Sequence, residues 1–193
     1  IYIEMSIYEK FKNAFVEKVK QLKIGNPLSD VNIGAVVSQP HMEKILSYIE
    51  LAKLDGGTVL CGGHQVKLDG EQSEGYYIAP TVIEGLSHSC RTNQEEIFGP
   101  VVTLTPFDDE EEALMMANST KYGLASIVWT ENLTRAHRIA NKLHAGIVWI
   151  NCWLLRDLRT PFGGVKQSGV GREGGFEALD FFTEPKNVCI KFG

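Results

Sequence analysis

The sequence predicts an α/β fold, a mostly parallel sheet with helices on both faces. Short runs of β-branched and aromatic residues recur along the 193 residues. Amphipathic segments of about ten to fifteen residues separate them, as in chains that build parallel sheets through helical crossovers. A hydrophobic content of 44% supplies enough apolar side chains for a substantial core. We therefore expect one globular domain with its functional loops at the carboxyl ends of the strands.

The first half of the chain predicts two helices and several strands. Residues 1–3 have strand character, and Ser6 and Glu9 have the spacing of a capping box, so a helix is expected from about Ile7. Its apolar face comprises Ile7, Phe11, Phe15, Val19 and Leu22. After a short buried stretch at 33–37, Pro40 opens a second helix with Met42, Ile45, Leu46, Ile49 and Ala52 inward. Next come a strand at 58–61, a polar hairpin at 62–77, and a returning strand at 76–83 interrupted at Pro80.

The second half continues the alternation of strands and helices. Acidic residues at 108–112 fit the first turn of a helix, and Asn132 is a cap for a helix through Leu143. Residues 177–182 have helical character. Strands are expected at 101–105, 125–130 (buried), 147–151 and 187–192.

Composition excludes several classes of function. A net charge of −5 and a pI near 5.6 argue against nucleic acid or an anionic membrane as the main partner. No apolar run approaches the roughly 20 residues that span a bilayer. The four cysteines are scattered and lack metal-ligand spacing, so we expect no metal site, buried thiols and a reducing, cytoplasmic location.

Residues 95–101, Glu-Glu-Ile-Phe-Gly-Pro-Val, form the first candidate site. Pro100 restricts Gly99 to an extended conformation, so Glu96 and Phe98 are expected to project together on one side. A carboxylate beside an aromatic ring suits a sugar diol under a flat heteroaromatic ring. The alternative is a solvated acidic turn before a core strand. Glu95 is interpreted as a solvated neighbour.

Residues 160–175 contain six glycines, which predict a long, sharply turned loop close to other backbone. Together the stretches E-E-I-F-G-P and P-F-G-G-V-K-Q-S-G-V-G-R-E-G closely resemble the C-terminal part of the aldehyde dehydrogenase superfamily, in this order. The resemblance runs the length of the chain. It implies the catalytic-domain fold of that family, with a C-terminal strand that joins subunits.

The resemblance also implies site residues. Glu96 matches the acid that accepts the hydroxyls of the nicotinamide ribose, and Phe98 matches the aromatic residue beside it. His41 falls where some relatives approach the cofactor, although an exposed first-turn residue is an equal alternative. The expected cofactor is NAD, with NADP as an alternative. No cysteine of this chain has the setting of the family's nucleophile, so we expect no catalytic residue here.

In relatives, the nucleophilic cysteine lies a few residues before the segment that matches the start of this chain, and the general base also lies upstream. Residues 1–3 begin inside a strand without an initiator Met. We therefore expect the chain to be the later part of a longer enzyme that oxidises an aldehyde through a thioester. A non-catalytic assembly fragment is the rival interpretation.

Residues 152–161 match the loop that holds the substrate's tail. Arg-Asp-Leu-Arg at 156–159, before Thr-Pro-Phe-Gly-Gly, looks like the muconate semialdehyde dehydrogenases, those acting on 2-aminomuconate or 2-hydroxymuconate semialdehyde. Arg156 would bind the substrate carboxylate, its guanidinium left free because Asp157 points away, with Leu155 and Phe162 lining an apolar tunnel. The alternatives are a surface ion-pair cluster with Asp157 or Arg159, and a general aliphatic or retinal-type aldehyde.

We divide the chain into a catalytic domain, residues 1–183, and an oligomerisation strand, residues 184–193. Val188, Ile190 and Phe192 alternate with Cys189 and Lys191, the pattern of a half-buried strand. At the end of a chain such a strand is an exposed edge unless another strand covers it. We therefore expect a homodimer or homotetramer.

Overall fold

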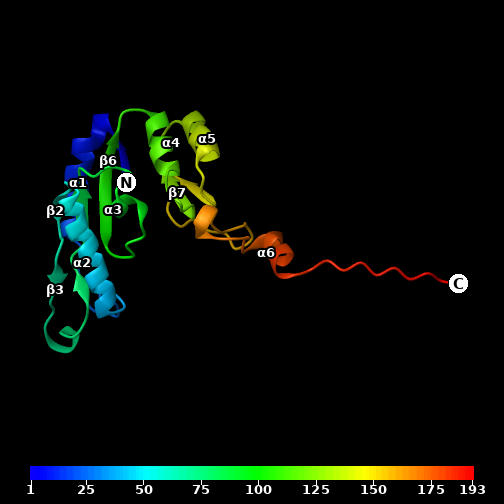
Figure 1. The fold of residues 1–193 in the computed structure, drawn as a ribbon, viewed down its shortest axis with the longest axis horizontal. Helices are drawn as coiled ribbons and strands as arrows, with labels where there is room; N and C mark the ends of the chain where they lie inside the picture. Colours follow the sequence, from blue (N-terminus) through cyan, green and yellow to red (C-terminus); the bar gives the residue numbers. More distant parts are fainter. The chain divides into compact units, whose positions relative to one another are not determined.

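The computed structural model describes residues 1–193 and divides them into two compact units, Ile1–Ala113 and Leu114–Gly193. Helix α4 (Glu110–Asn118) contains the boundary. Figure 1 shows the alternation of helices and strands along the chain. The predicted α/β class is confirmed.

A four-stranded sheet forms the centre of the first unit, in the order β1-β6-β5-β2. The three strands β1, β6 and β5 are parallel, and β2 joins the edge antiparallel to β5. Their bounds are Tyr2–Glu4 for β1, Thr58–Cys61 for β2, Thr81–Glu84 for β5 and Val101–Phe107 for β6. The sheet of this unit is therefore mostly parallel, as predicted.

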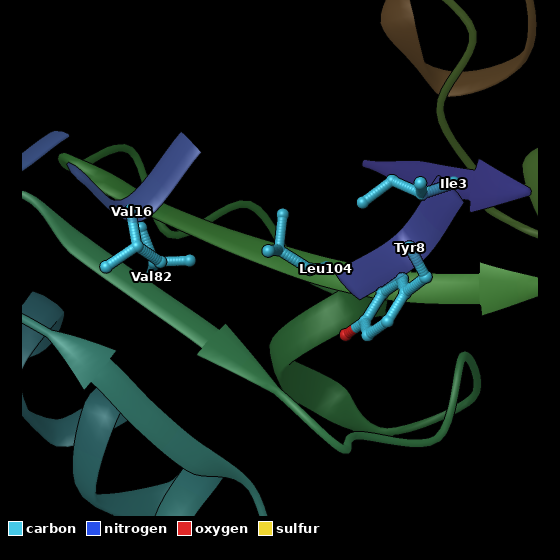
Figure 2. Close-up of a cluster of buried hydrophobic side chains, with 5 residues drawn as sticks. All are labelled: Ile3, Tyr8, Val16, Val82 and Leu104. Carbon is cyan, nitrogen blue, oxygen red and sulfur yellow. The ribbon is translucent and has the colours of Figure 1, made fainter. Parts of the chain in front are cut away.

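Helices α1 (Tyr8–Lys20) and α2 (Gln39–Leu54) cover opposite faces of this sheet. Neighbouring strand residues point to opposite faces, and Val82 packs with α1 whereas Ile83 packs with Ala52 of α2. Figure 2 shows the α1 side, where five buried side chains meet: Ile3, Tyr8, Val16, Val82 and Leu104. The periodic apolar face of α2 is confirmed, with Met42, Ile45, Ile49 and Ala52 all buried.

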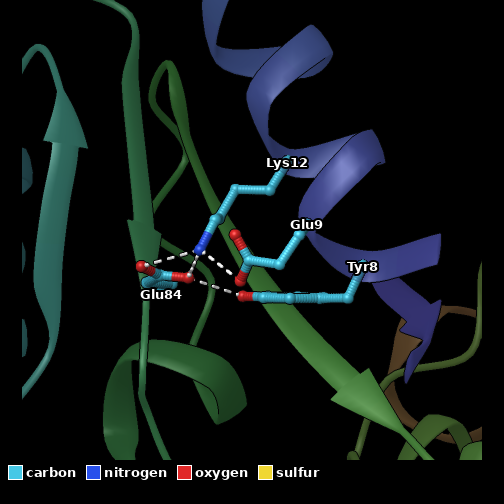
Figure 3. Close-up of polar contacts among 4 residues, drawn as sticks. All are labelled: Tyr8, Glu9, Lys12 and Glu84. Atoms are coloured by element: carbon cyan, nitrogen blue, oxygen red, sulfur yellow. Dashed lines mark hydrogen bonds and ion pairs between the residues drawn. The ribbon is translucent and has the colours of Figure 1, made fainter. Parts of the chain in front are cut away.

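A polar cluster crosses from α1 to the sheet beside this core (Figure 3). The Tyr8 hydroxyl donates to Glu84 at 2.8 Å, and the Lys12 ammonium lies 3.1 Å from Glu84 and 2.8 Å from Glu9. Burial, reinforced by the Glu84 hydrogen bond, raises the pKa of Tyr8 to about 12. The phenol therefore stays protonated and links helix and strand.

The start of α1 differs from the predicted capping box. A 3-10 turn, η1 (Met5–Ile7), precedes the helix, and the Ser6 hydroxyl donates to Glu4 at 3.1 Å. No side chain caps the first turn of α1. The helix packs through Tyr8 and Val16 with Phe11, Phe15 and Val19, while Ile7 is 51% exposed. The buried stripe is thus rotated away from Ile7.

The segment between α1 and α2 is less buried than predicted. Of residues 33–37, Val36 packs on the α2 core, but Val37 is 87% exposed. The expected hairpin after β2 is present as β3 (Gln65–Val66) paired antiparallel with β4 (Tyr77–Ile78), with the 3-10 turn η2 (Gly70–Gln72) at its tip. A short helix, α3 (Arg91–Gln94), follows β5.

The second unit is built on two parallel strands, β7 (Ala125–Val128) and β8 (Ile147–Ile150), joined through α5 (Leu133–Lys142). The Asn132 side chain accepts the backbone N–H of Arg135 at 2.9 Å, which confirms the predicted cap. Strand β7 is half exposed, so the prediction of a buried strand at 125–130 is wrong. The remaining elements are η3 (Lys166–Ser168) and α6 (Gly175–Phe182).

Residues 184–193 contain no strand, so the predicted element at 187–192 has no ladder partner in the single chain. Val188, Ile190 and Phe192 are 68%, 71% and 85% exposed. Pairing with another subunit therefore stays a prediction, as does the division at residue 183. No helix in the chain has the length and apolar character needed to traverse a membrane.

Candidate functional site

The candidate cofactor segment, residues 95–99, lies along α2. Ile97 packs into the core cluster of Met42, Ile45 and Ile49. A Cβ added to Gly99 would lie 2.6 Å from Ile45 Cδ1, so only glycine permits this approach. Phe98 has a left-handed backbone, with φ 62°. Strand alternation therefore does not determine where the side chains of Glu96 and Phe98 project. The predicted reason for grouping these two residues is wrong.

Two side chains of α2 hold the carbonyls of this segment. His41 Nε2 lies 2.7 Å from the carbonyl oxygen of Phe98, and the Lys44 ammonium donates to the carbonyl of Glu96 at 3.1 Å. The rings of His41 and Phe98 meet edge to face, with centroids 6.3 Å apart. These bonds leave the side chains of Glu96 and Phe98 exposed.

Glu96 and Phe98 have the properties that a ribose and a flat ring would require. The Glu96 carboxylate is exposed and makes no hydrogen bond or ion pair within the chain. Phe98 is 73% exposed, so its ring is accessible to a ligand. A left-handed non-glycine residue stores about 1–3 kcal/mol of strain, which is typical of functional sites. The residues present therefore fit a nicotinamide riboside.

Glu95 is not the solvated neighbour that we expected. Its carboxylate accepts the Tyr48 hydroxyl and a two-pronged bond from Arg91, at 2.8 and 2.9 Å. Lys44, Tyr48 and Arg91 were not among the residues predicted from the sequence. The signal for the first two was their spacing of three and seven residues from His41, which places all three on one face of α2.

The candidate substrate residues lie in the second unit. Phe162 and Glu173 exchange two backbone hydrogen bonds of 2.8 Å, which bring the two ends of the glycine loop together. Arg156 Nη2 lies 3.0 Å from Glu173 Oε1, and the guanidinium carbon lies 4.0 Å from the centroid of the Phe162 ring. The structure therefore brings Arg156 and Phe162 together.

Two expectations about this loop need correction. The Arg156 guanidinium is not free, because Glu173 binds it; the Asp157 carboxylate pairs with Arg159 instead. The apolar side chains around Arg156 do not enclose a tunnel within this chain, since Leu155 is 75% exposed. The buried Trp149 anchors the loop by donating its indole N–H to the Leu155 carbonyl at 3.0 Å.

The glycine loop is held by the polar side chains of its own motif. The Lys166 ammonium donates to the carbonyls of Asn118 and Thr120, both at 2.9 Å, and Ser168 accepts the N–H of Gly123 at 2.9 Å. The expected close approach of backbone is confirmed: a Cβ added to Gly146 would lie 1.7 Å from the Gly163 oxygen. We therefore interpret Lys166 and Ser168 as residues that stabilise the conformation of the loop.

The four cysteines are all unpaired. Cys61, Cys90 and Cys152 are partly buried and Cys189 is exposed, so the expectation of buried thiols was wrong. Burial raises the pKa of Cys61, which disfavours the nucleophilic thiolate. No group of three or more His, Cys, Asp or Glu side chains is arranged to hold a metal ion.

Comparison with known proteins gives a consistent family. The aldehyde dehydrogenase family profile matches residues 1–188. The chain is 47% identical over 192 residues to the 2-aminomuconic 6-semialdehyde dehydrogenase of Pseudomonas sp., and 45% identical over 194 residues to the human 2-aminomuconic semialdehyde dehydrogenase. Each alignment covers 99% of this chain but only 39% and 40% of the relative.

Solved structures agree with this. The indole-3-acetaldehyde dehydrogenase of P. syringae, determined with NAD+ and IAA, superposes with a TM-score of 0.92 at 43% identity, covering 99% of this chain and 38% of its own. An aldehyde dehydrogenase from Bacillus cereus in its NAD+ complex gives 0.89 at 42% identity, covering 95% and 36%. The chain thus spans about 40% of the length of the curated relatives cited. On these grounds the chain belongs to the aldehyde dehydrogenase family.

Proposed function

We propose that the chain provides cofactor and substrate contacts for an NAD-dependent oxidation of an aldehyde to a carboxylic acid. The proposed substrate is a semialdehyde that carries a carboxylate, of the 2-aminomuconate type. The observation that carries the proposal is the exposed, unpaired carboxylate of Glu96 next to the strained and exposed Phe98. Relatives named for muconic semialdehydes and neighbours solved with NAD+ support it.

In this proposal Glu96 accepts hydrogen bonds from both hydroxyls of the nicotinamide ribose. Each bond to the charged carboxylate is worth about 1.5–3 kcal/mol. Phe98 contacts the ribose and ring, and His41 holds Phe98 through its carbonyl. When bound, NAD+ would supply the hydride acceptor for this oxidation. A thiolate from outside residues 1–193 supplies the covalent step, because none of the four cysteines here has the required setting.

Arg156 recognises the substrate carboxylate by exchanging partners. Its pair with Glu173 is partly exposed, with 38% and 62% of the two side chains accessible. Exposed pairs contribute about 0–1 kcal/mol, so a better-placed carboxylate displaces Glu173 readily. The planar guanidinium then binds that carboxylate through two parallel hydrogen bonds. The Phe162 ring, which lies against the guanidinium, keeps the guanidinium in place.

The ion pair between Arg156 and Glu173 also favours a second candidate function, that of a dehydrogenase without a carboxylate requirement. If Arg156 only ties the loop 152–161 to the glycine loop, the substrate is a general aliphatic or retinal-type aldehyde. An assembly role without chemistry is the remaining rival.

The test is NADH formation, followed at its absorbance, by the full-length protein that carries this chain. We expect turnover with NAD+ and a six-carbon carboxylate semialdehyde to exceed turnover with the neutral aldehyde of equal length. Equal turnover would support the general aldehyde dehydrogenase. Absence of NADH with every aldehyde tested would overturn the proposed function.

A further inference from the structure

We propose that Tyr48 is a positioning residue for hydride transfer: its hydrogen bond to Glu95 fixes the backbone from which Glu96 meets the nicotinamide ribose. The inference rests on the proposed function and extends it to α2, a helix whose own side chains need not touch substrate. It assigns a role to the cluster of Tyr48, Arg91 and Glu95.

Three polar side chains of α2 are spaced so that they lie on one stripe of the helix. His41, Lys44 and Tyr48 follow one another at three and four residues, so one stripe of the helix faces residues 95–98. Two of their contacts are to main-chain carbonyls, those of Phe98 and Glu96, and the third is to the side-chain carboxylate of Glu95. The segment is therefore held at three of its four residues, 95, 96 and 98.

The contact at the Glu95 carboxylate is a strong one. Arg91 binds the Glu95 carboxylate through two nitrogens, the geometry of a strong charge-assisted pair. The carboxylate in turn accepts the Tyr48 hydroxyl and raises its pKa, chiefly through that hydrogen bond. The Tyr48 hydroxyl therefore remains a donor across the physiological range.

The Tyr48 ring also lies close to two cations, one of them Lys44. The Lys44 ammonium lies 5.8 Å and the Arg91 guanidinium carbon 5.9 Å from the centroid of the Tyr48 ring. Both cations are close enough to be attracted by the ring. The same Lys44 ammonium donates to the Glu96 carbonyl, so the Tyr48 ring and hydroxyl both act on the position of Glu96.

This arrangement explains how a strained segment stays in one conformation. Residue 98 is left-handed, and such a backbone persists only where its surroundings determine it. Without the Tyr48 hydroxyl, Glu95 keeps Arg91 but loses this hydrogen bond to α2. The Glu96 carboxylate then samples more positions, and misplacement of reacting groups slows hydride transfer.

The experiment uses Tyr48→Phe in the full-length protein, which removes the hydroxyl and keeps the ring. We measure the single-turnover rate of NADH formation, the aldehyde KM and the dissociation constant of NADH by fluorescence. Glu95→Gln is the second variant. Glu50→Gln is the matched control, because it breaks an exposed ion pair with Lys53 on the same helix.

We expect Tyr48→Phe and Glu95→Gln to slow hydride transfer by about ten- to a hundredfold, with the aldehyde KM unchanged and Glu50→Gln like wild type. Because Tyr48 acts through Glu96, Tyr48→Phe combined with Glu96→Gln should be no slower than Glu96→Gln alone. Multiplicative losses in the double variant, or wild-type hydride transfer in Tyr48→Phe, would overturn the positioning role. A wild-type protein that forms no NADH would instead overturn the proposed function.

Discussion

Arg156 and Glu173, 17 residues apart in the chain, form an ion pair with 3.0 Å between nitrogen and oxygen. The guanidinium lies over the Phe162 ring at the same time. In the proposed function this arrangement is a preorganised carboxylate receptor, because the Phe162 ring and the Glu173 pair fix the orientation of the guanidinium before a ligand arrives.

Replacement of Arg156 tests this receptor. In the full-length protein, Arg156→Ala should lower kcat/KM for a carboxylate semialdehyde by one to a few powers of ten, a loss of about 2–4 kcal/mol in transition-state stabilisation. The kcat/KM for a neutral aldehyde of equal length should hardly change. Steady-state kinetics with both substrates measure the difference. Equal losses for the two aldehydes would mean that Arg156 only braces the loop.

Glu173 provides the reciprocal test. In the proposal Glu173 competes with the substrate carboxylate for Arg156, so Glu173→Gln should lower the KM for the carboxylate semialdehyde severalfold, a gain of at most about 1 kcal/mol in binding free energy. Glu177→Gln, an exposed acid on α6 with no ion pair to Arg156, is the control and should leave KM unchanged. A higher KM in Glu173→Gln would contradict the exchange of partners.

Tyr8 gives a pH-dependent prediction for the first unit. An unfolded tyrosine loses its proton at about pH 10, whereas burial raises the pKa of Tyr8 in the fold to about 12. The folded state therefore binds this proton more tightly, so its contribution is complete below about pH 10 and is lost as pH rises toward 12.

Urea unfolding at a series of pH values measures the effect. Tyr8→Phe should lower the free energy of unfolding near neutral pH by about 1 kcal/mol, through the lost Glu84 hydrogen bond. It should also flatten the decline above about pH 10. Tyr76→Phe is the control, because Tyr76 lies in the same unit without a hydroxyl hydrogen bond. Identical declines in the two variants would rule out Tyr8 as the titrating group.

The sequence predicted the elements whose signals are local. Helix α2 combines a Ser38 cap, Pro40 in the first turn and a continuous apolar stripe, so its bounds and its core face were both predictable. Strand β6 was predictable for similar reasons, because a Gly-Pro break precedes a β-branched run.

Features that depend on distant contacts were not predictable. The left-handed backbone of Phe98 results from the burial of Ile97 against α2 together with the bonds from His41 and Lys44. Glu173 reaches Arg156 only because Phe162 and Glu173 pair across the glycine loop. In the same way Ser6 matched the capping pattern, yet its hydroxyl is used by Glu4. Tertiary contacts decided each of these.

The exposed residues 184–193 lead to a prediction about how subunits assemble. Val188, Ile190 and Phe192 are exposed in the single chain and share one face of an extended segment. We expect the full-length protein to be a dimer or tetramer in light scattering, and deletion of residues 184–193 to give monomer or aggregate. Val188→Asp should weaken the assembly, whereas Lys191→Asp, on the opposite face, should not. An unchanged oligomer after the deletion would refute this role.

Glu96→Gln tests most directly the claim that the Glu96 carboxylate binds the nicotinamide ribose. The amide keeps the shape of the side chain and removes the charge that strengthens its bonds to the ribose, each worth about 1.5–3 kcal/mol. In the full-length protein, rapid mixing with NAD+ and aldehyde should show hydride transfer slowed by at least about tenfold, because the ring is no longer held in place. Wild-type rates of hydride transfer together with wild-type NAD+ affinity would show that Glu96 is a solvated turn residue and does not bind the cofactor.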